Sequence, residues 1–167
     1  RVAGAPLVPC MKCEDCMKGD YALCKHYSFI GTRQPGSFAE YICVPEQNAV
    51  PFDDSVSFEQ GALFEPAAVA LHGLECLPYE GGKTVAILGG GTIGLLVMQW
   101  ANIFGAAKTV VFDIDDDRIK LAKEMGAYDG VNTLEEGFME KAMAMTDGKG
   151  FDYIYETAGS TITMKMA

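Results

Sequence analysis

The chain has 167 residues, enough for one substantial hydrophobic core or for parts of two domains. Apolar residues make up 49% of it and charged residues 22%, as in folded proteins, and the net charge of −10 argues against a nucleic-acid partner because phosphates would be repelled. No run of about 18 apolar residues predicts a membrane span and no secretory signal is visible, so we expect a cytoplasmic protein without a membrane partner.

Residues 1 to about 36 hold four of the six cysteines and show no long hydrophobic periodicity. Cys10, Cys13, Cys16 and Cys24 follow the spacing C-x2-C-x2-C-x7-C, whose short gaps allow a turn to bring thiolates to about 2.3 Å from one metal ion. Four thiolates leave no open position, which predicts a structural zinc site. The alternatives fit less well, because a ferredoxin-like cluster has its fourth cysteine three residues on and disulfides need an oxidising compartment.

Residues 37 to about 55 predict strand and loop. Four residues of this stretch favour strands: Phe38, Tyr41, Ile42 and Val44. The two remaining cysteines, Cys43 and Cys76, stand on apolar stretches, and we expect them to be small buried side chains without a function.

From Ser57 onward the apolar pattern alternates between helix and strand. Helices are predicted over 66–77, 92–104, 115–125 and 134–145, and strands over 83–88, 108–113, 129–131 and 151–155. Strands separated by helices of this length form βαβ units with right-handed crossovers. We therefore expect an α/β fold, the first part of a doubly wound parallel sheet of the Rossmann type.

The segment ILGGGTIGLL places Gly89-x-Gly91-x-x-Gly94 directly after a strand and at the opening of a helix. In a dinucleotide-binding turn the first glycine permits the tight turn, the second lets the backbone approach a pyrophosphate, and the third lets helix and strand pack closely. The free N–H groups at the helix start, around Thr92 and Ile93, would receive the phosphates. The alternative is a glycine-rich packing turn.

An acidic residue at the end of the next strand is the second part of this fingerprint. Asp113 stands nineteen residues after Gly94 and closes the strand TVVFD. Its carboxylate would accept hydrogen bonds from the ribose hydroxyls and repel a 2′-phosphate, which favours NAD over NADP. Arg118 is placed to lie against the adenine, although an arginine on the first exposed turn of a helix is as often only solvated.

Four stretches resemble the zinc-containing medium-chain alcohol and polyol dehydrogenases: LVPCMKCEDCMKGDYALC, SFIGTRQPGSFAEYICV, GALFEPAAVALHGL and ILGGGTIGLL. The resemblance runs through the whole chain but covers only the middle of a family member, and with Arg1 as the first residue we expect a piece of a longer protein. It implies that residues 1–56 are part of a GroES-like catalytic domain including the zinc lobe, and that residues 57–167 are the first half of the NAD-binding domain.

The resemblance also implies a function, the oxidation of a polyol to a ketose with NAD. Galactitol 1-phosphate is the first candidate substrate, and sorbitol or threonine is the alternative. Family members form dimers or tetramers, so we expect a homo-oligomer. Because upstream ligands of the catalytic zinc and the second half of the nucleotide-binding domain have no counterpart here, we expect this chain alone to be inactive.

Three segments match family positions near the reacting centre. Glu65 in FEP matches a glutamate ligand of the catalytic zinc, with helix capping as the alternative role. Arg33 lies in FIGTRQPGSF, which lines the substrate cleft in relatives, and a guanidinium suits a sugar phosphate. A loop arginine facing solvent is the equal alternative for Arg33. YETAG (155–159) resembles the segment near the nicotinamide side of the cofactor.

The alternative interpretation, from another functional class, is a non-catalytic zinc-ribbon joined to a nucleotide-binding module. The strand region SFAEYICVPEQNAVPF favours the enzyme, because a bare zinc ribbon would not need it.

Overall fold

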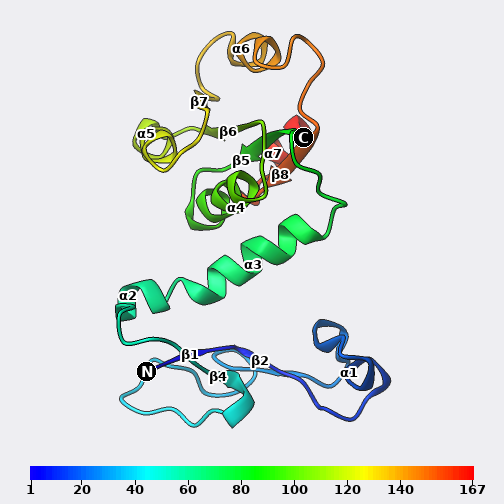
Figure 1. The fold of residues 1–167 in the computed structure, drawn as a ribbon, viewed down its shortest axis with the longest axis vertical. Helices are drawn as coiled ribbons and strands as arrows, with labels where there is room; N and C mark the ends of the chain where they lie inside the picture. The colour runs from blue at the N-terminus through cyan, green and yellow to red at the C-terminus, as the bar shows by residue number, and fades with distance from the viewer. The chain divides into compact units, whose positions relative to one another are not determined.

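The computed structural model describes residues 1–167, which form two compact units, Arg1–Glu65 and Pro66–Ala167 (Figure 1). The expected domain boundary after residue 56 stays a prediction, because compactness within this chain does not define the domains of a longer protein. None of the helices combines the length and the apolar character that a membrane crossing requires.

The first unit is built from short elements. Strand β1 (Val2–Gly4) pairs antiparallel with β4 (Ala49–Pro51), and β2 (Leu7–Val8) pairs antiparallel with β3 (Ser28–Phe29). Its helical elements are α1 (Glu14–Lys18), η1 (Tyr21–Leu23), η2 (Glu46–Asn48) and α2 (Phe58–Gly61). The buried Asn48 amide donates to the carbonyl oxygens of Ala5 and Leu7, each at 2.7 Å, and so joins η2 to the chain between the end of β1 and the start of β2.

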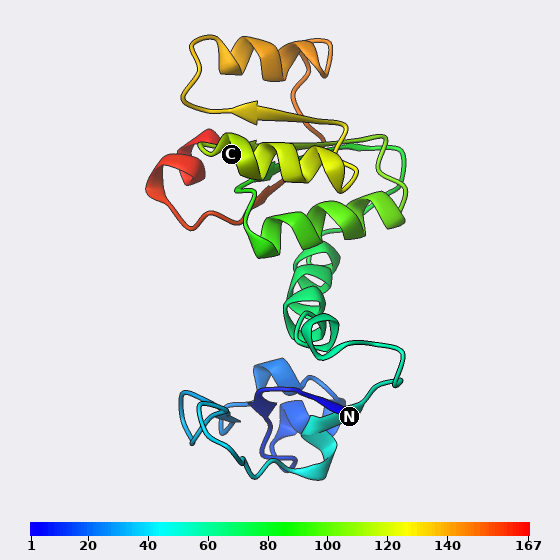
Figure 2. The same ribbon diagram turned by 90° about the vertical axis from the view of Figure 1, so that its left-hand side faces the viewer.

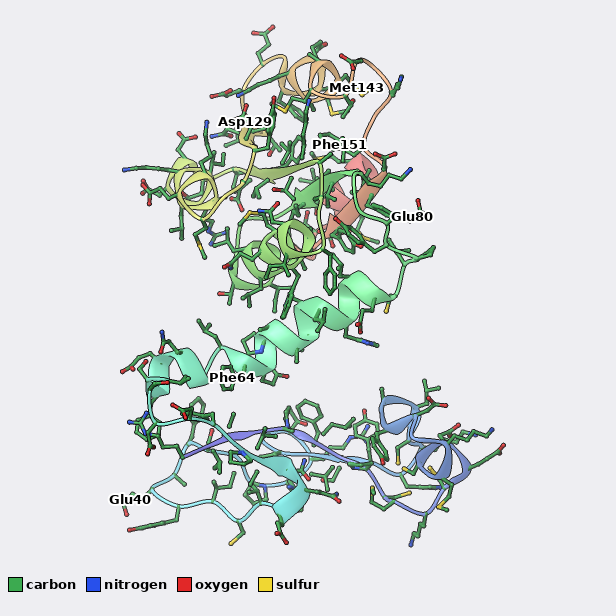
Figure 3. The ribbon with its side chains drawn as sticks, viewed as in Figure 1. Glu40, Phe64, Glu80, Asp129, Met143 and Phe151 are labelled. Atoms are coloured by element: carbon green, nitrogen blue, oxygen red, sulfur yellow. The ribbon has the colours of Figure 1, made fainter.

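The strand expected around residues 38–44 is absent, and the first unit has loop there. Phe38 and Tyr41 are almost fully exposed, and Glu40 between them points away from the ribbon (Figure 3). β-forming side chains stabilise a strand only when its backbone pairs with a neighbour and one face is covered, and no strand lies along this segment. The expected burial of Cys43 and Cys76 is also wrong, since both are exposed.

The second unit contains the predicted parallel sheet. Its strands are β5 (Thr84–Leu88), β6 (Lys108–Asp113), β7 (Asp129–Asn132) and β8 (Tyr153–Glu156). They lie in the order β7-β6-β5-β8, and every pair is parallel. The order therefore runs outward from β5 to β7 and then returns to the other side of β5, as in the first part of a doubly wound fold.

Helices cover both faces of this sheet (Figures 1 and 2). One core joins Val85 and Ile87 to α4 (Thr92–Ile103), α5 (Asp116–Glu124) and the second half of α3 (Phe64–Glu75). The other joins Ala86 and Leu88 to α6 (Phe138–Ala144) and α7 (Thr161–Met166). Successive residues of β5 thus face opposite layers, which explains its continuous apolar run.

The ends of α4 and α5 lie within one residue of the expected ones, whereas α3 is shifted by two residues at both ends and α6 starts four residues late. Gly105 follows α4 with φ +83°, and Ala106 N–H donates to Ala101 carbonyl oxygen at 2.9 Å in the expected glycine-terminated arrangement. Helix α3 begins two residues before Pro66, which is tolerated because the first helical turn needs no proline N–H. Helix α6 begins only at residue 138, since Gly137 has φ +79° and interrupts helical geometry.

Candidate functional site

The four cysteines of the first unit converge around α1. Their Sγ atoms all lie within 4.8 Å of one another, with Cys16 and Cys24 buried and Cys10 and Cys13 half-buried. Cys13 is the N-cap of α1, Cys16 lies within it, and Cys24 follows η1. Met11 adopts φ +58°, a left-handed conformation that turns the chain sharply between the first two ligand positions.

The spacing of these sulfur atoms fits a tetrahedral zinc ion. A tetrahedron with Zn–S bonds of about 2.3 Å has edges of about 3.8 Å. The Sγ atoms of Cys10 and Cys16 are 3.9 Å apart, as are those of Cys13 and Cys24. The backbone N–H of Cys10 also donates to Cys24 Sγ at 3.3 Å, a contact that stabilises a thiolate ligand.

The thiols differ in their ease of ionisation. Hydrogen bonding from the backbone of Lys12 lowers the pKa of Cys10 to about 6, and the backbone of Cys16 lowers the pKa of Cys13. Burial raises the pKa of Cys16 to about 12, with the neighbouring thiols adding to the shift. Four thiolates this close are mutually unfavourable unless a cation lies among them, so this cluster could hold a metal ion.

In the second unit, the glycine turn joins β5 to α4 with almost no free space at two of its glycines. A β-carbon on Gly94 would lie 1.9 Å from Gly89 carbonyl oxygen, and one on Gly89 would lie 2.9 Å from Ala158 N. A β-carbon on Gly91 would meet no atom within 4 Å, although Gly91 is the N-cap of α4. The backbone is therefore open to a ligand at the one glycine where the helix N–H groups emerge.

Asp113 lies beside this turn at the end of β6. Its Oδ2 accepts a hydrogen bond from Gly90 N–H at 2.6 Å, and its Oδ1 accepts from the N–H groups of Ile114 and Asp115 at 2.8 and 3.1 Å. A carboxylate has about four acceptor positions, so one remains on Oδ2. The Arg118 guanidinium lies 3.6 Å from that oxygen.

The other residues expected at the cofactor site surround the same turn. Thr92 is exposed at the first position of α4, and Ile93 packs on the core. Arg118 is exposed in the first turn of α5 and also lies 4.0 Å from Asp115. The structure thus brings the expected cofactor residues together at the carboxyl ends of β5 and β6.

One further side chain at this edge was not singled out from the sequence. Thr157 follows β8, and its Oγ1 lies 3.0 Å from the carbonyl oxygens of both Leu88 and Gly89. Thr157 lies in YETAG, whose resemblance to the family segment near the nicotinamide was the signal available from the sequence, but that resemblance identifies neither the residue nor its partner strand.

Glu65 and Arg33 lie outside both clusters. Glu65 is exposed in the first turn of α3, not at its cap position. Arg33 is exposed; it donates to Tyr27 carbonyl oxygen at 3.1 Å, and its guanidinium lies 4.0 Å over the Tyr27 ring. Their expected roles in the metal and substrate sites stay predictions.

Two domain families match the chain. Residues 1–54 match the alcohol dehydrogenase GroES-like domain, and residues 92–167 match the zinc-binding dehydrogenase domain. Both agree with the fold expected for the two parts of the chain.

Several curated relatives resemble the chain along nearly all of its length. It is 38% identical to galactitol 1-phosphate 5-dehydrogenase of Escherichia coli over 99% of the chain. It is 36% identical both to sorbitol dehydrogenase of Bacillus subtilis, over 100% of the chain, and to L-threonine 3-dehydrogenase of Rhizobium johnstonii, over 96%. These matches cover 48%, 48% and 46% of the relatives, so the chain spans about half the length of the curated relatives it matches.

Solved structures give the same result. The crystal structure of galactitol-1-phosphate dehydrogenase from Escherichia coli matches 99% of the chain and 48% of its own with a TM-score of 0.89, at 38% identity. A zinc-binding dehydrogenase from Sinorhizobium meliloti, bound to NADP, matches 98% of the chain and 48% of its own with a TM-score of 0.87, at 34% identity.

Proposed function

Since the chain belongs to the family of zinc-containing medium-chain dehydrogenases, we propose that the whole protein transfers hydride from a secondary alcohol of a polyol to NAD. The observation that carries this proposal is the glycine turn at the carboxyl end of β5, where the strand order reverses between β6 and β8. Dinucleotides bind at that point of doubly wound sheets.

The turn supports a pyrophosphate at Gly91, where the backbone is open, with the N–H groups at the start of α4 directed at it. The remaining acceptor position of Asp113 suits one ribose hydroxyl. A 2′-phosphate there would face a buried carboxylate, which supports NAD as the preferred cofactor even though a relative binds NADP.

We propose two zinc sites in the whole protein. Cys10, Cys13, Cys16 and Cys24 would hold a structural ion, as their sulfur spacing supports. Glu65 is proposed as a ligand of the catalytic ion, directly or through water, on the strength of its family position. When bound, a catalytic zinc ion polarises the substrate hydroxyl and lowers its pKa.

Galactitol 1-phosphate is the substrate that we propose first, because the chain is 38% identical to an enzyme named for it. Arg33 supports a phosphorylated substrate, since Tyr27 leaves most of its guanidinium donors free. In the whole protein, R33A is then expected to raise KM for the phosphorylated polyol far more than for an unphosphorylated one. Equal effects on both substrates would remove Arg33 from the phosphate site.

Sorbitol and threonine are the alternative substrates, because relatives named for them are 36% identical to the chain. The deciding experiment measures kcat/KM of the whole protein with NAD and with NADP on galactitol 1-phosphate, sorbitol and threonine. Turnover of none of them, with cofactor still bound, would favour a nucleotide-binding module instead. We also propose a homo-oligomer for the whole protein, which sedimentation of the active enzyme would test.

A further inference from the structure

Thr157 links β8 to the turn that follows the neighbouring strand β5. Its backbone N–H donates to Leu88 carbonyl oxygen at 2.9 Å. Its Oγ1 lies 3.0 Å from that oxygen and 3.0 Å from Gly89 carbonyl oxygen. A hydroxyl has one proton, so the two carbonyls share it. The first glycine of the turn is therefore tied to a strand that follows it by more than sixty residues.

The same hydroxyl occupies the space that two glycines leave. A β-carbon on Gly94 would lie 2.8 Å from Thr157 Oγ1, and one on Gly89 would lie 3.0 Å from it. Thr157 and these glycines form one closely packed contact beneath the opening of α4. The turn is thus confined on its inner side, whereas Gly91 on its outer side is open.

The backbone that follows Thr157 is held by the side chain of Glu156, the residue before it. Glu156 Oε1 accepts hydrogen bonds from the N–H groups of Ala158 and Gly159 at 3.0 and 2.9 Å and from Thr163 Oγ1 at 2.7 Å. The Thr163 hydroxyl, followed by these backbone groups, holds the pKa of Glu156 below its usual range, so the carboxylate is ionised at neutral pH. The backbone is therefore fixed on both sides of Thr157, by the Leu88 carbonyl oxygen before it and by the Glu156 carboxylate after it.

We propose that Thr157 is a positioning residue for dinucleotide binding, whose hydroxyl holds Gly89 so that the N–H groups at the start of α4 face the pyrophosphate. The inference rests on the proposed function, namely that this turn binds a nicotinamide dinucleotide. A turn free to move would have to be ordered when the ligand binds, and that cost lowers affinity.

The test compares NADH affinity among variants of the whole protein, by fluorescence titration, with urea unfolding measured in parallel. T157S keeps the hydroxyl. T157C has nearly the same shape as T157S but a much weaker donor. T157V keeps the branched shape without a donor. T146V is the matched control, because Thr146 Oγ1 also bonds backbone groups, those of Met143 and Gly150, away from the turn.

We expect T157V and T157C to raise the Kd for NADH by about three- to tenfold, the effect of one lost hydrogen bond, and T157S and T146V to change it less than twofold. Unchanged affinity in T157V, or in T157C if T157V does not fold, would overturn the role of Thr157 alone. An equal loss of NADH affinity in T146V would overturn it too, because the effect would then come from a general loosening of the fold. A wild-type protein that binds no NADH would instead refute the proposed function itself.

Discussion

The carboxylate of Asp113 accepts a 2.6 Å hydrogen bond from the backbone N–H of Gly90, which ties the end of β6 to the glycine turn after β5. Asp113 is 7% exposed, and a β-carbon on Gly90 would lie 3.3 Å from its Oδ2. Asp113, which we predict to bind the cofactor ribose, therefore also supports the turn through a hydrogen bond within the protein.

Replacing this carboxylate tests both of its roles. D113N keeps the shape but replaces one acceptor oxygen with a donor group, so at least one backbone N–H loses its partner. We expect the free energy of unfolding to fall by about 1–3 kcal/mol. In the whole protein, the ratio of kcat/KM with NADP to that with NAD should rise, because repulsion of the 2′-phosphate is removed. D117N is the control at an exposed aspartate of α5, and matching results for the two variants would contradict both roles.

Two glycines of the turn should separate folding from binding. In G94A the new β-carbon would lie 1.9 Å from a backbone oxygen, so the helix must shift, at a cost of about 1–3 kcal/mol or more. In G91A the β-carbon enters open space and Gly91 has φ −76°, so stability should change by less than about 0.5 kcal/mol.

Unlike stability, NADH binding should be sensitive to substitution of Gly91. Its new methyl group would occupy the space proposed for the pyrophosphate, so G91A is expected to weaken NADH binding at least about tenfold. Urea unfolding and fluorescence titration measure the two effects in the whole protein. Full NADH affinity in G91A would mean that the pyrophosphate does not approach the turn there.

The elements that the sequence predicted well are those whose signal is local. Strand β6 was predicted with its observed bounds and α4 within one residue, because a strand buried on both faces is continuously apolar and Gly105 ends the helix. The four-cysteine cluster is local for the same reason, since its ligands lie within fifteen residues of chain.

The contacts that shape the candidate cofactor site could not be predicted in this way. Asp113 and Gly90 are 23 residues apart, and Thr157 and Gly89 are 68 apart. Periodicity indicates a strand but not which neighbour it pairs with, so it cannot bring these side chains together. The loop around Phe38 was missed for the opposite reason, because a strand-forming composition has no effect where no partner strand is present.

The pH dependence of stability should reflect Asp152, which precedes β8. Its Oδ2 accepts hydrogen bonds from Thr84 N–H at 2.8 Å and Thr84 Oγ1 at 2.9 Å. These bonds, with Lys83 nearby, hold the pKa of Asp152 below its ordinary value of 3.8. A carboxyl group with a lowered pKa in the folded state stabilises it above the unfolded pKa, and this contribution is lost as the pH falls through the folded pKa.

The measurement is the free energy of urea unfolding of wild type and D152N from pH 7 to pH 3. The wild-type advantage should be constant down to about pH 5 and then shrink as the pH falls below about 4. T84V removes one of the two donors and should reduce the advantage at neutral pH. A difference between wild type and D152N that does not vary with pH would show that the ionised carboxylate contributes nothing.

Removal of metal should affect the first unit selectively. The region around α1 buries few apolar side chains besides Cys16 and Cys24, so we expect its fold to depend on a metal cross-link between the thiolates. C24S replaces a buried ligand and is expected to lower the zinc content of the whole protein by one ion per chain. Hydrogen exchange should then become fast in residues 10–24 and stay slow in β5 and β6, whose core is separate.

The exposed Cys76 provides the control, and C76S should leave zinc content and exchange unchanged. Slow exchange in residues 10–24 of C24S, with zinc lost, would mean that this lobe folds without its metal.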